Sequence, residues 1–124
     1  MKNPVLWSYV FEHYEKLIKE NFDYLLQLNL AKRLADSQYA DFLHPSTSHF
    51  GLVISPKENH SESLNFPSIA VQQLDEQRFE VTYSPKQIQT HNISKRILHH
   101  SEVWSYLESL ILKLKLNSEE TETY

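Results

Sequence analysis

Cysteine is absent from this chain of 124 residues, and glycine occurs only once. Without cysteine the chain has no disulfide framework, thiolate nucleophile or cysteine-containing zinc site. The one glycine, Gly51, lies inside an apolar run, whereas loops that hold phosphate groups need several glycines so that backbone N–H groups can approach the anion. The sequence therefore excludes nucleotide sites of the Walker and Rossmann types and the G-x-S-x-G turn of serine hydrolases.

Long apolar runs and an excess of positive charge are also absent. No stretch approaches the roughly 20 apolar residues of a membrane span, and residues 1–17 lack the apolar core and cleavage site of an export signal. The formal net charge is −4, of which Glu119, Glu120 and Glu122 contribute three charges, so the rest of the chain is close to neutral. We expect a cytoplasmic protein that binds neither membranes nor nucleic acids.

The overall composition is that of an ordinary globular protein, with 40% hydrophobic and 23% charged residues. A chain of this length buries most of its apolar surface without help from metals or disulfides. We predict one α+β domain over residues 1–116, followed by a flexible acidic tail over residues 117–124.

The first part of the chain has a helical pattern. Asn3 and Pro4 form a helix start, because asparagine caps free N–H groups and proline loses no hydrogen bond at the first helical position. Apolar residues then recur every three or four positions, which predicts a buried stripe. They are Trp7, Val10, Phe11, Tyr14, Leu17, Ile18, Phe22, Leu25 and Leu28. We expect residues 4–35 to form one long helix or two abutting helices, with Asn21 and Asn29 as the weak points.

The middle of the chain has the patterns of β-strands. Residues 49–55 are apolar on both faces, which is typical of an interior strand. Residues 68–74 and 78–84 alternate around the turn 75–77 and predict an antiparallel hairpin. A fourth strand over residues 87–93 has a weaker pattern, so we expect it at an edge of the sheet.

A last helix is expected to begin near Ser101, which can cap it, and to carry its own apolar stripe. The stripe consists of Val103, Trp104, Leu107, Leu110, Ile111 and Leu114. A run of strands between helices favours an α+β fold. We predict an antiparallel sheet of three or four strands, with the long N-terminal helix (or two) and the C-terminal helix packed on one face.

Seven histidines raise the question of metal or catalytic chemistry, but no H-E-x-x-H pair occurs. We therefore predict no metal site and no cofactor. The alternative is a small hydrolase or nuclease in which His91, His99 and His100 converge, with His100 as the base. Adjacent side chains usually diverge, which favours solvated turn histidines instead. Residues 44–49 hold two histidines and three hydroxyls and are interpreted as a loop, with a serine nucleophile there as the weaker reading.

Candidate binding residues lie on the polar side of the predicted hairpin. If the apolar side chains of residues 78–84 face the helices, the opposite face is polar and open. It would carry Gln72, Arg78, Glu80 and Thr82, together with Gln89 and His91 of the fourth strand. Tyrosine offers a large amphipathic area at modest entropic cost, so Tyr39 is a further candidate, along with Tyr9 and Tyr24.

These observations favour a non-catalytic protein–protein interaction module that binds another protein. Small acidic partner-binding proteins such as toxin-neutralising immunity proteins and secretion chaperones have this size and charge, which is a comparison of type only. The alternatives are the histidine-dependent hydrolase or nuclease and a ligand-binding domain with an apolar cavity between helices and sheet. A homodimer through the fourth strand is a further expectation.

Overall fold

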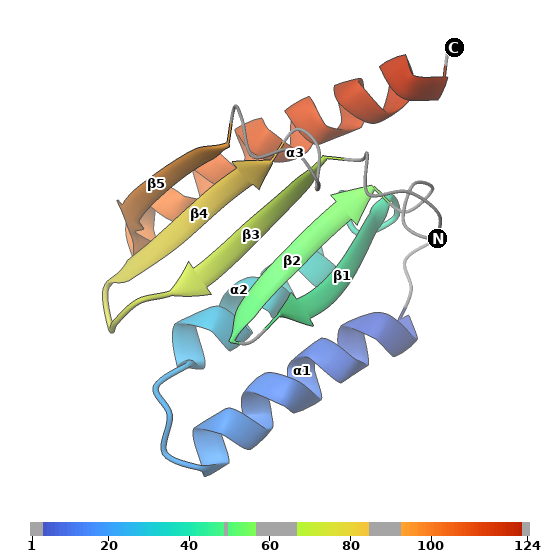
Figure 1. Cartoon of the computed structure of the whole chain (residues 1–124). Coiled ribbons are helices and arrows are strands. Elements are labelled where there is room, and N and C mark those ends of the chain that lie inside the picture. Colours follow the sequence, from blue (N-terminus) through green and yellow to red (C-terminus); the bar gives the residue numbers. More distant parts are fainter. Residues whose placement is uncertain (1–3, 49, 57–66, 85–92, 123–124) are drawn as a thin grey trace.

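The computed structural model describes residues 4–48, 50–56, 67–84 and 93–122. Within these ranges the chain forms three helices and five strands (Figure 1). In chain order they are α1 (Pro4–Lys19), α2 (Leu25–Ala35), β1 (Leu43–Ser48), β2 (Gly51–Pro56), β3 (Ser68–Gln73), β4 (Arg78–Ser84), β5 (Ser94–His99) and α3 (His100–Glu122). The α+β class predicted from the sequence is confirmed.

The strands form one antiparallel sheet in the order β1-β2-β3-β4-β5, so each strand pairs with its neighbour in the sequence. The predicted hairpin is present as β3 and β4, in which Gln73 lies opposite Phe79 and Ser68 lies opposite Ser84. The expected strand count of three or four is wrong, because the described part of the sheet has five strands. Most of the predicted fourth strand, residues 87–92, lies outside the described residues.

The two strands that the sequence did not reveal are β1 and β5. Residues 44–48 were interpreted as a loop, yet every residue of β1 pairs with one of β2, and Pro45 lies opposite Ile54. β5 occupies residues that we expected to precede the last helix, and Arg96 there lies opposite Val81. In both strands, pairing with an apolar neighbour outweighs the polar local sequence.

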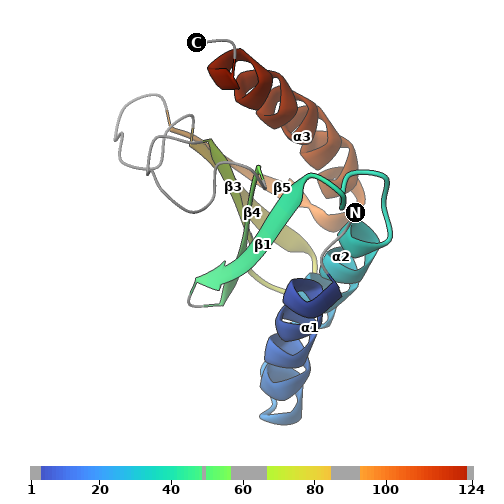
Figure 2. The same ribbon diagram turned by 90° about the vertical axis from the view of Figure 1, so that its right-hand side faces the viewer.

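The helices lie to one side of the sheet (Figure 2). α1 packs against α2 and β1, whereas α3 runs across β2, β3, β4 and β5. Buried side chains from all three helices and all five strands join in one core, which includes Trp7, Leu34, Ile54, Val81 and Leu107. The arrangement of the helices differs in detail from the expectation, because α1 contacts α2 and the edge strand β1, whereas α3 contacts four strands. The side of the sheet turned away from the helices carries the candidate site.

α1 and α2 are separate helices, and the break falls at Asn21. Asn21 has a φ of 71°, the left-handed conformation that commonly ends a helix. Its N–H donates to the Ile18 carbonyl at 3.0 Å, and the Phe22 N–H donates to the Leu17 carbonyl at 3.0 Å. These two bonds satisfy carbonyls that the end of α1 leaves free. Of the two weak points expected, Asn21 is the break and Asn29 lies within α2.

α3 begins at His100, and the residue that caps it is His99 rather than Ser101. The His99 Nδ1 atom accepts a hydrogen bond from the Ser101 N–H at 3.2 Å and lies 2.8 Å from the Ser101 hydroxyl. The His100 N–H donates to the carbonyl of Gln77 in the β3–β4 turn at 2.7 Å. The helix continues to Glu122, so much of the expected acidic tail is helical, while its flexibility stays a prediction.

A buried polar network ties the two N-terminal helices to the sheet. The Gln27 side chain is fully buried, and its Nε2 donates to the Val71 carbonyl at 2.7 Å and to the Tyr14 hydroxyl at 3.3 Å. The Tyr14 hydroxyl donates in turn to the Phe50 carbonyl at 3.1 Å. Burial raises the pKa of the Tyr14 phenol, in keeping with a hydroxyl that donates a proton to a carbonyl.

Most of the apolar residues expected in the core are buried, but Phe22 and Leu25 are not. Phe22 is 47% exposed, because α1 ends before it, and its ring stacks on Phe50 with centroids 5.9 Å apart. Among the expected core aromatics, Trp7 and Tyr14 are buried, whereas Phe11 and Trp104 are half-buried against the core. No helix in the described ranges is both long enough and apolar enough to cross a membrane.

Candidate functional site: the open face of the sheet

The face of the sheet turned away from the helices, here called the open face, has a polar composition. Side chains alternate along each strand, so the neighbours of the buried residues Leu52, Val71 and Val81 point away from the core. The strand register then defines the open face in the central and β5 part of the sheet. It consists of Val53, Ala70, Gln72, Arg78, Glu80, Thr82, Lys95, Ile97 and His99.

Two rows of side chains cross the β5 half of the open face. Gln72, Glu80 and Ile97 lie opposite one another on β3, β4 and β5. The next row holds Thr82 and Lys95, and the Lys95 ammonium lies 3.8 Å from the Glu80 carboxylate. Ile97 is 53% exposed at the β5 end of the first row, opposite Glu80 and on the same strand face as Lys95. An accessible aliphatic side chain with a polar surround is the usual anatomy of a protein contact.

The four hairpin residues expected on this face are all present on it. Gln72 and Arg78 are exposed, and Glu80 and Thr82 are half-buried. Gln89 and His91, which were expected to join them, lie outside the described residues.

The expectation that Tyr39 is an exposed contact is wrong. Tyr39 is 8% exposed, and its hydroxyl donates to Glu108 Oε2 of α3 at 2.7 Å. Its ring also packs edge-on against Phe42. Tyr39 thus joins the turn after α2 to α3. Of the other two tyrosines, Tyr9 is 63% exposed and Tyr24 is half-buried.

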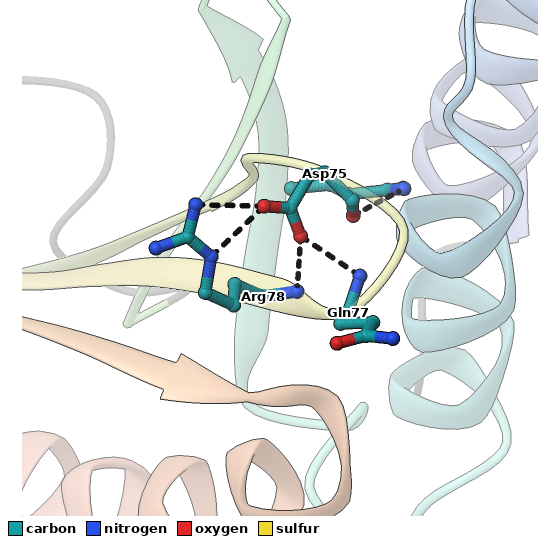
Figure 3. Close-up of polar contacts among 4 residues, drawn as sticks. Asp75, Gln77 and Arg78 are labelled. Atoms are coloured by element: carbon teal, nitrogen blue, oxygen red, sulfur yellow. Dashed lines mark hydrogen bonds and ion pairs between the residues drawn. The ribbon is translucent and has the colours of Figure 1, made fainter.

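An exposed ion pair lies at the β3–β4 turn, at one end of the open face (Figure 3). Asp75 Oδ1 accepts hydrogen bonds from the N–H groups of Gln77 and Arg78, both at 2.9 Å. Asp75 Oδ2 accepts from Arg78 Nε at 2.8 Å and lies 2.7 Å from Arg78 Nη2. The hydrogen bond from the Arg78 side chain and the backbone bonds lower the pKa of Asp75. The guanidinium is therefore held along the turn.

The opposite end of the same face is less accessible. Ser55 of β2 and Ser68 of β3 also point to this side, and their exposed fractions are only 5% and 7%. A partner would therefore reach the face from the β5 side, where the side chains of Gln72, Lys95 and Ile97 are exposed.

The histidines behave differently from the sequence expectation. The rings of His99 and His100 do not diverge but lie against each other, with centroids 4.3 Å apart. Both side chains are exposed, and the Nδ1 atom of His99 is already engaged by Ser101. Among the described residues, no group of three histidine or carboxylate side chains is placed to hold a metal ion. His44 and Ser46 of the expected loop lie on strand β1.

An apolar cavity was expected between the helices and the sheet, and the structure has a small groove between α2 and α3 there. It has a volume of about 150 Å³ and opens over Phe79 of β4, with Leu30 on one wall and Val103 on the other. The guanidinium of Arg33 lies 4.0 Å from the centre of the Trp104 ring and crosses the groove. Drug-sized ligands need roughly 300–1,000 Å³, so this groove is too small for such an occupant.

Sequence reasoning missed two parts of the site, Lys95 and Ile97. Ile97 lies opposite Glu80 and Lys95 lies opposite Thr82, and both positions follow only once the register of β5 is known. Comparison with protein-family models, with curated proteins and with solved structures finds no match for this chain. The site must therefore be interpreted from its own geometry.

Proposed function

We propose that this chain is a non-catalytic protein-binding module that receives its partner on the open face of the sheet. The observation that carries the proposal is the exposed aliphatic side chain of Ile97 among the polar side chains of Gln72, Glu80 and Lys95. A pleated surface of small and polar groups offers hydrogen bonds to a partner, and Ile97 offers an apolar anchor. The cytoplasm is the proposed location.

The histidine-dependent hydrolase is the weaker candidate. A general base needs a free lone pair within reach of a substrate in a cleft. The His99 Nδ1 atom serves the start of α3, and both ring systems lie on the surface. The ligand-binding alternative is weakened by the small volume of the groove between α2 and α3.

The test compares two double variants with the same change in charge. One carries Gln72→Glu and Thr82→Glu on the open face, and the control carries Ser8→Glu and Gln38→Glu at exposed positions of α1 and the turn after α2. Proteins captured from the natural host by the tagged wild-type chain are identified, purified and titrated against each variant by calorimetry. Two bulky charges on a binding face should weaken the affinity at least about tenfold, which corresponds to about 1.4 kcal/mol.

The control should keep the affinity of the wild type. Equal affinity of the wild type and the open-face variant for the purified partner would overturn the proposal. A His100→Ala variant adds an independent check, because it changes no residue of the open face and should bind the purified partner as the wild type does.

A further inference from the structure

Within the described residues, the backbone of β5 directs hydrogen-bonding groups outward at the edge of the sheet. The Leu74 N–H donates to the Arg78 carbonyl at 2.9 Å in the β3–β4 turn. Arg78, an even-numbered residue of β4, therefore directs its backbone groups toward β3. Successive residues of a strand direct their N–H and C=O groups to opposite sides, so the odd-numbered residues of β4 direct theirs toward β5. Their partners are Ser94, Arg96 and Leu98. The alternate residues, Lys95, Ile97 and His99, therefore direct their N–H groups away from the sheet.

Two other hydrogen bonds agree with this assignment. The Gln77 carbonyl, which lies in the same alternation as the odd-numbered residues of β4, accepts from the His100 N–H on the β5 side. The Val71 carbonyl of β3 points away from β4 and accepts from the Gln27 side chain. The direction of the β5 backbone thus follows from three separate contacts.

The other edge of the sheet lacks the same capacity. By the same alternation, Val53 of β2 directs its backbone groups toward Ser46 of β1. The backbone of the next residue, Pro45, therefore faces outward from the sheet. Proline has no N–H, so the middle of that edge has no donor for an added strand. α1 also packs against β1. Of the two described edges, β5 has outward N–H groups at three alternate residues, whereas β1 lacks the central one at Pro45.

Space for a further strand lies directly beside β5. A shallow groove of about 500 Å³ separates the strand from the exposed side of α3. Its walls include Arg96 and Leu98 of β5, Tyr106 of α3 and the short side chains of Ser101 and Ser105. The Arg96 guanidinium lies over the Tyr106 ring at 5.1 Å. Side chains on one face of an added strand would enter this groove.

The charges of β5 select the kind of strand that can be added. Lys95, Arg96 and His99 are exposed, and the strand contains no carboxylate. The Glu80 carboxylate of β4 lies 3.8 Å from the Lys95 ammonium, a long distance for an ion pair. Glu102 of α3 lines the groove. A second copy would bring a strand with the same Lys95 and Arg96 charges and no carboxylate against this edge, and like charges across paired strands destabilise a sheet.

We propose that β5 is the docking edge for an extended acidic segment of a partner protein, which adds to the sheet as a further strand. The segment has acidic side chains on the open face, beside Lys95 and His99, and apolar side chains in the groove, beside Leu98 and Tyr106. Main-chain bonds supply affinity in this mode of recognition, and alternate side chains supply specificity. The inference rests on the proposed function and names the class of partner that it requires.

The first test uses the ¹⁵N-labelled chain and a blocked octapeptide of alternating glutamate and valine. The peptide should shift the amide resonances of Lys95, Ile97 and His99 and slow the hydrogen exchange of the Lys95 and Ile97 amides. A matched octapeptide of alternating lysine and valine should bind at least about tenfold more weakly, because like charges repel across paired strands. Unchanged exchange of these amides at millimolar glutamate peptide would overturn the inference, and so would equal binding of the two peptides.

Ile97→Pro removes one outward N–H without removing a bond to β4, and edge strands tolerate proline at such a position. It should weaken binding of the glutamate peptide at least about tenfold, because the peptide loses one main-chain hydrogen bond and the proline ring occupies the position of the missing N–H. Ile97→Ala, which keeps the N–H, is the control and should bind more tightly than Ile97→Pro. If Ile97→Pro fails to fold by circular dichroism, the exchange measurement on the wild-type chain decides.

Two results separate this inference from the proposed function. If the Gln72→Glu and Thr82→Glu variant loses the natural partner while Ile97→Pro and Ile97→Ala bind it equally well, the docking edge is wrong and the binding face stands, because only the proline removes the N–H. If the open-face variant and Ile97→Pro both bind the partner like the wild type, both proposals fail. A concentration-dependent dimer in sedimentation that protects the Lys95 and Ile97 amides would show that a second copy takes the edge, which also contradicts the inference.

Discussion

Gln27 and Gln73 bind each other's backbone across the interface between α2 and β3. The Gln73 N–H donates to Gln27 Oε1 at 2.7 Å, and the Gln27 N–H donates to Gln73 Oε1 at 3.0 Å. The pairing of β2 with β3 ends at Val71. Beyond it the Gln27 carboxamide bonds the Val71 carbonyl and the Gln73 N–H, as the backbone of a longer β2 would do. Gln73 in turn satisfies a first-turn N–H of α2, whose start has no side-chain cap of its own.

The first prediction concerns this exchange. Gln27→Leu keeps a similar side-chain volume but leaves the Val71 carbonyl and the Gln73 N–H buried without a partner. Each such loss costs about 1–3 kcal/mol, so the free energy of unfolding should fall by roughly 2–6 kcal/mol. Urea denaturation followed by circular dichroism measures it. Asn29→Leu, at an exposed position of the same helix, should change the stability little, and a similar loss in both variants would contradict the role of Gln27.

The second prediction concerns the left-handed residue between α1 and α2. Asn21→Gly should leave the free energy of unfolding unchanged or raise it slightly, because glycine adopts positive φ without steric cost. Asn21→Ala should lower it by about 1 kcal/mol, since a Cβ atom disfavours this conformation. Thermal unfolding of the two variants side by side provides the measurement, and a more stable alanine variant would show that the turn does not depend on this φ.

The third prediction is a pH dependence at the β3–β4 turn. The pKa of Asp75 is lowered in the folded chain, so its charge contributes stability above the unfolded pKa, near 3.8, and that contribution is lost as the pH falls through the folded pKa. Asp75→Asn keeps an oxygen for the Gln77 and Arg78 N–H groups but loses the charge. The wild type should be the more stable at neutral pH, and the difference should vanish in acid.

Salt provides the control for this third prediction. The ion pair of Asp75 and Arg78 is exposed, so added salt should shrink the stability difference at neutral pH. A difference that persists below the folded pKa would mean that the asparagine variant disturbs the turn itself, and the pH argument would then fail.

How far the sequence predicts this fold depends on whether local pattern and tertiary environment agree. The hairpin of β3 and β4 was predicted because Phe79, Val81 and Tyr83 alternate with polar residues and all three are buried. β5 was not, because Leu98 is its one buried side chain, and an edge strand with a single inward apolar residue has no visible alternation. Proline and hydroxyl residues made β1 resemble a loop, although pairing with β2 decides its conformation.

The candidate site was predictable in part for the same reason. Gln72, Arg78, Glu80 and Thr82 belong to the strands whose pattern was clear, whereas Ile97 depends on the register of β5. Tyr39 was expected at the surface because tyrosine suits contacts, but its hydroxyl is used inside the fold by Glu108. No local pattern distinguishes these two uses of a tyrosine.

The most direct test of the central claim is cross-linking from a single position on the open face. Benzoylphenylalanine is introduced in place of Gln72, and in a control chain in place of Lys32 on the exposed side of α2. The chains are irradiated in extract of the natural host. The account predicts one discrete adduct from the Gln72 position, displaced by excess untagged wild-type chain, and none from the Lys32 position. A competed adduct from Lys32, with none from Gln72, would place the binding surface on the helices and contradict it.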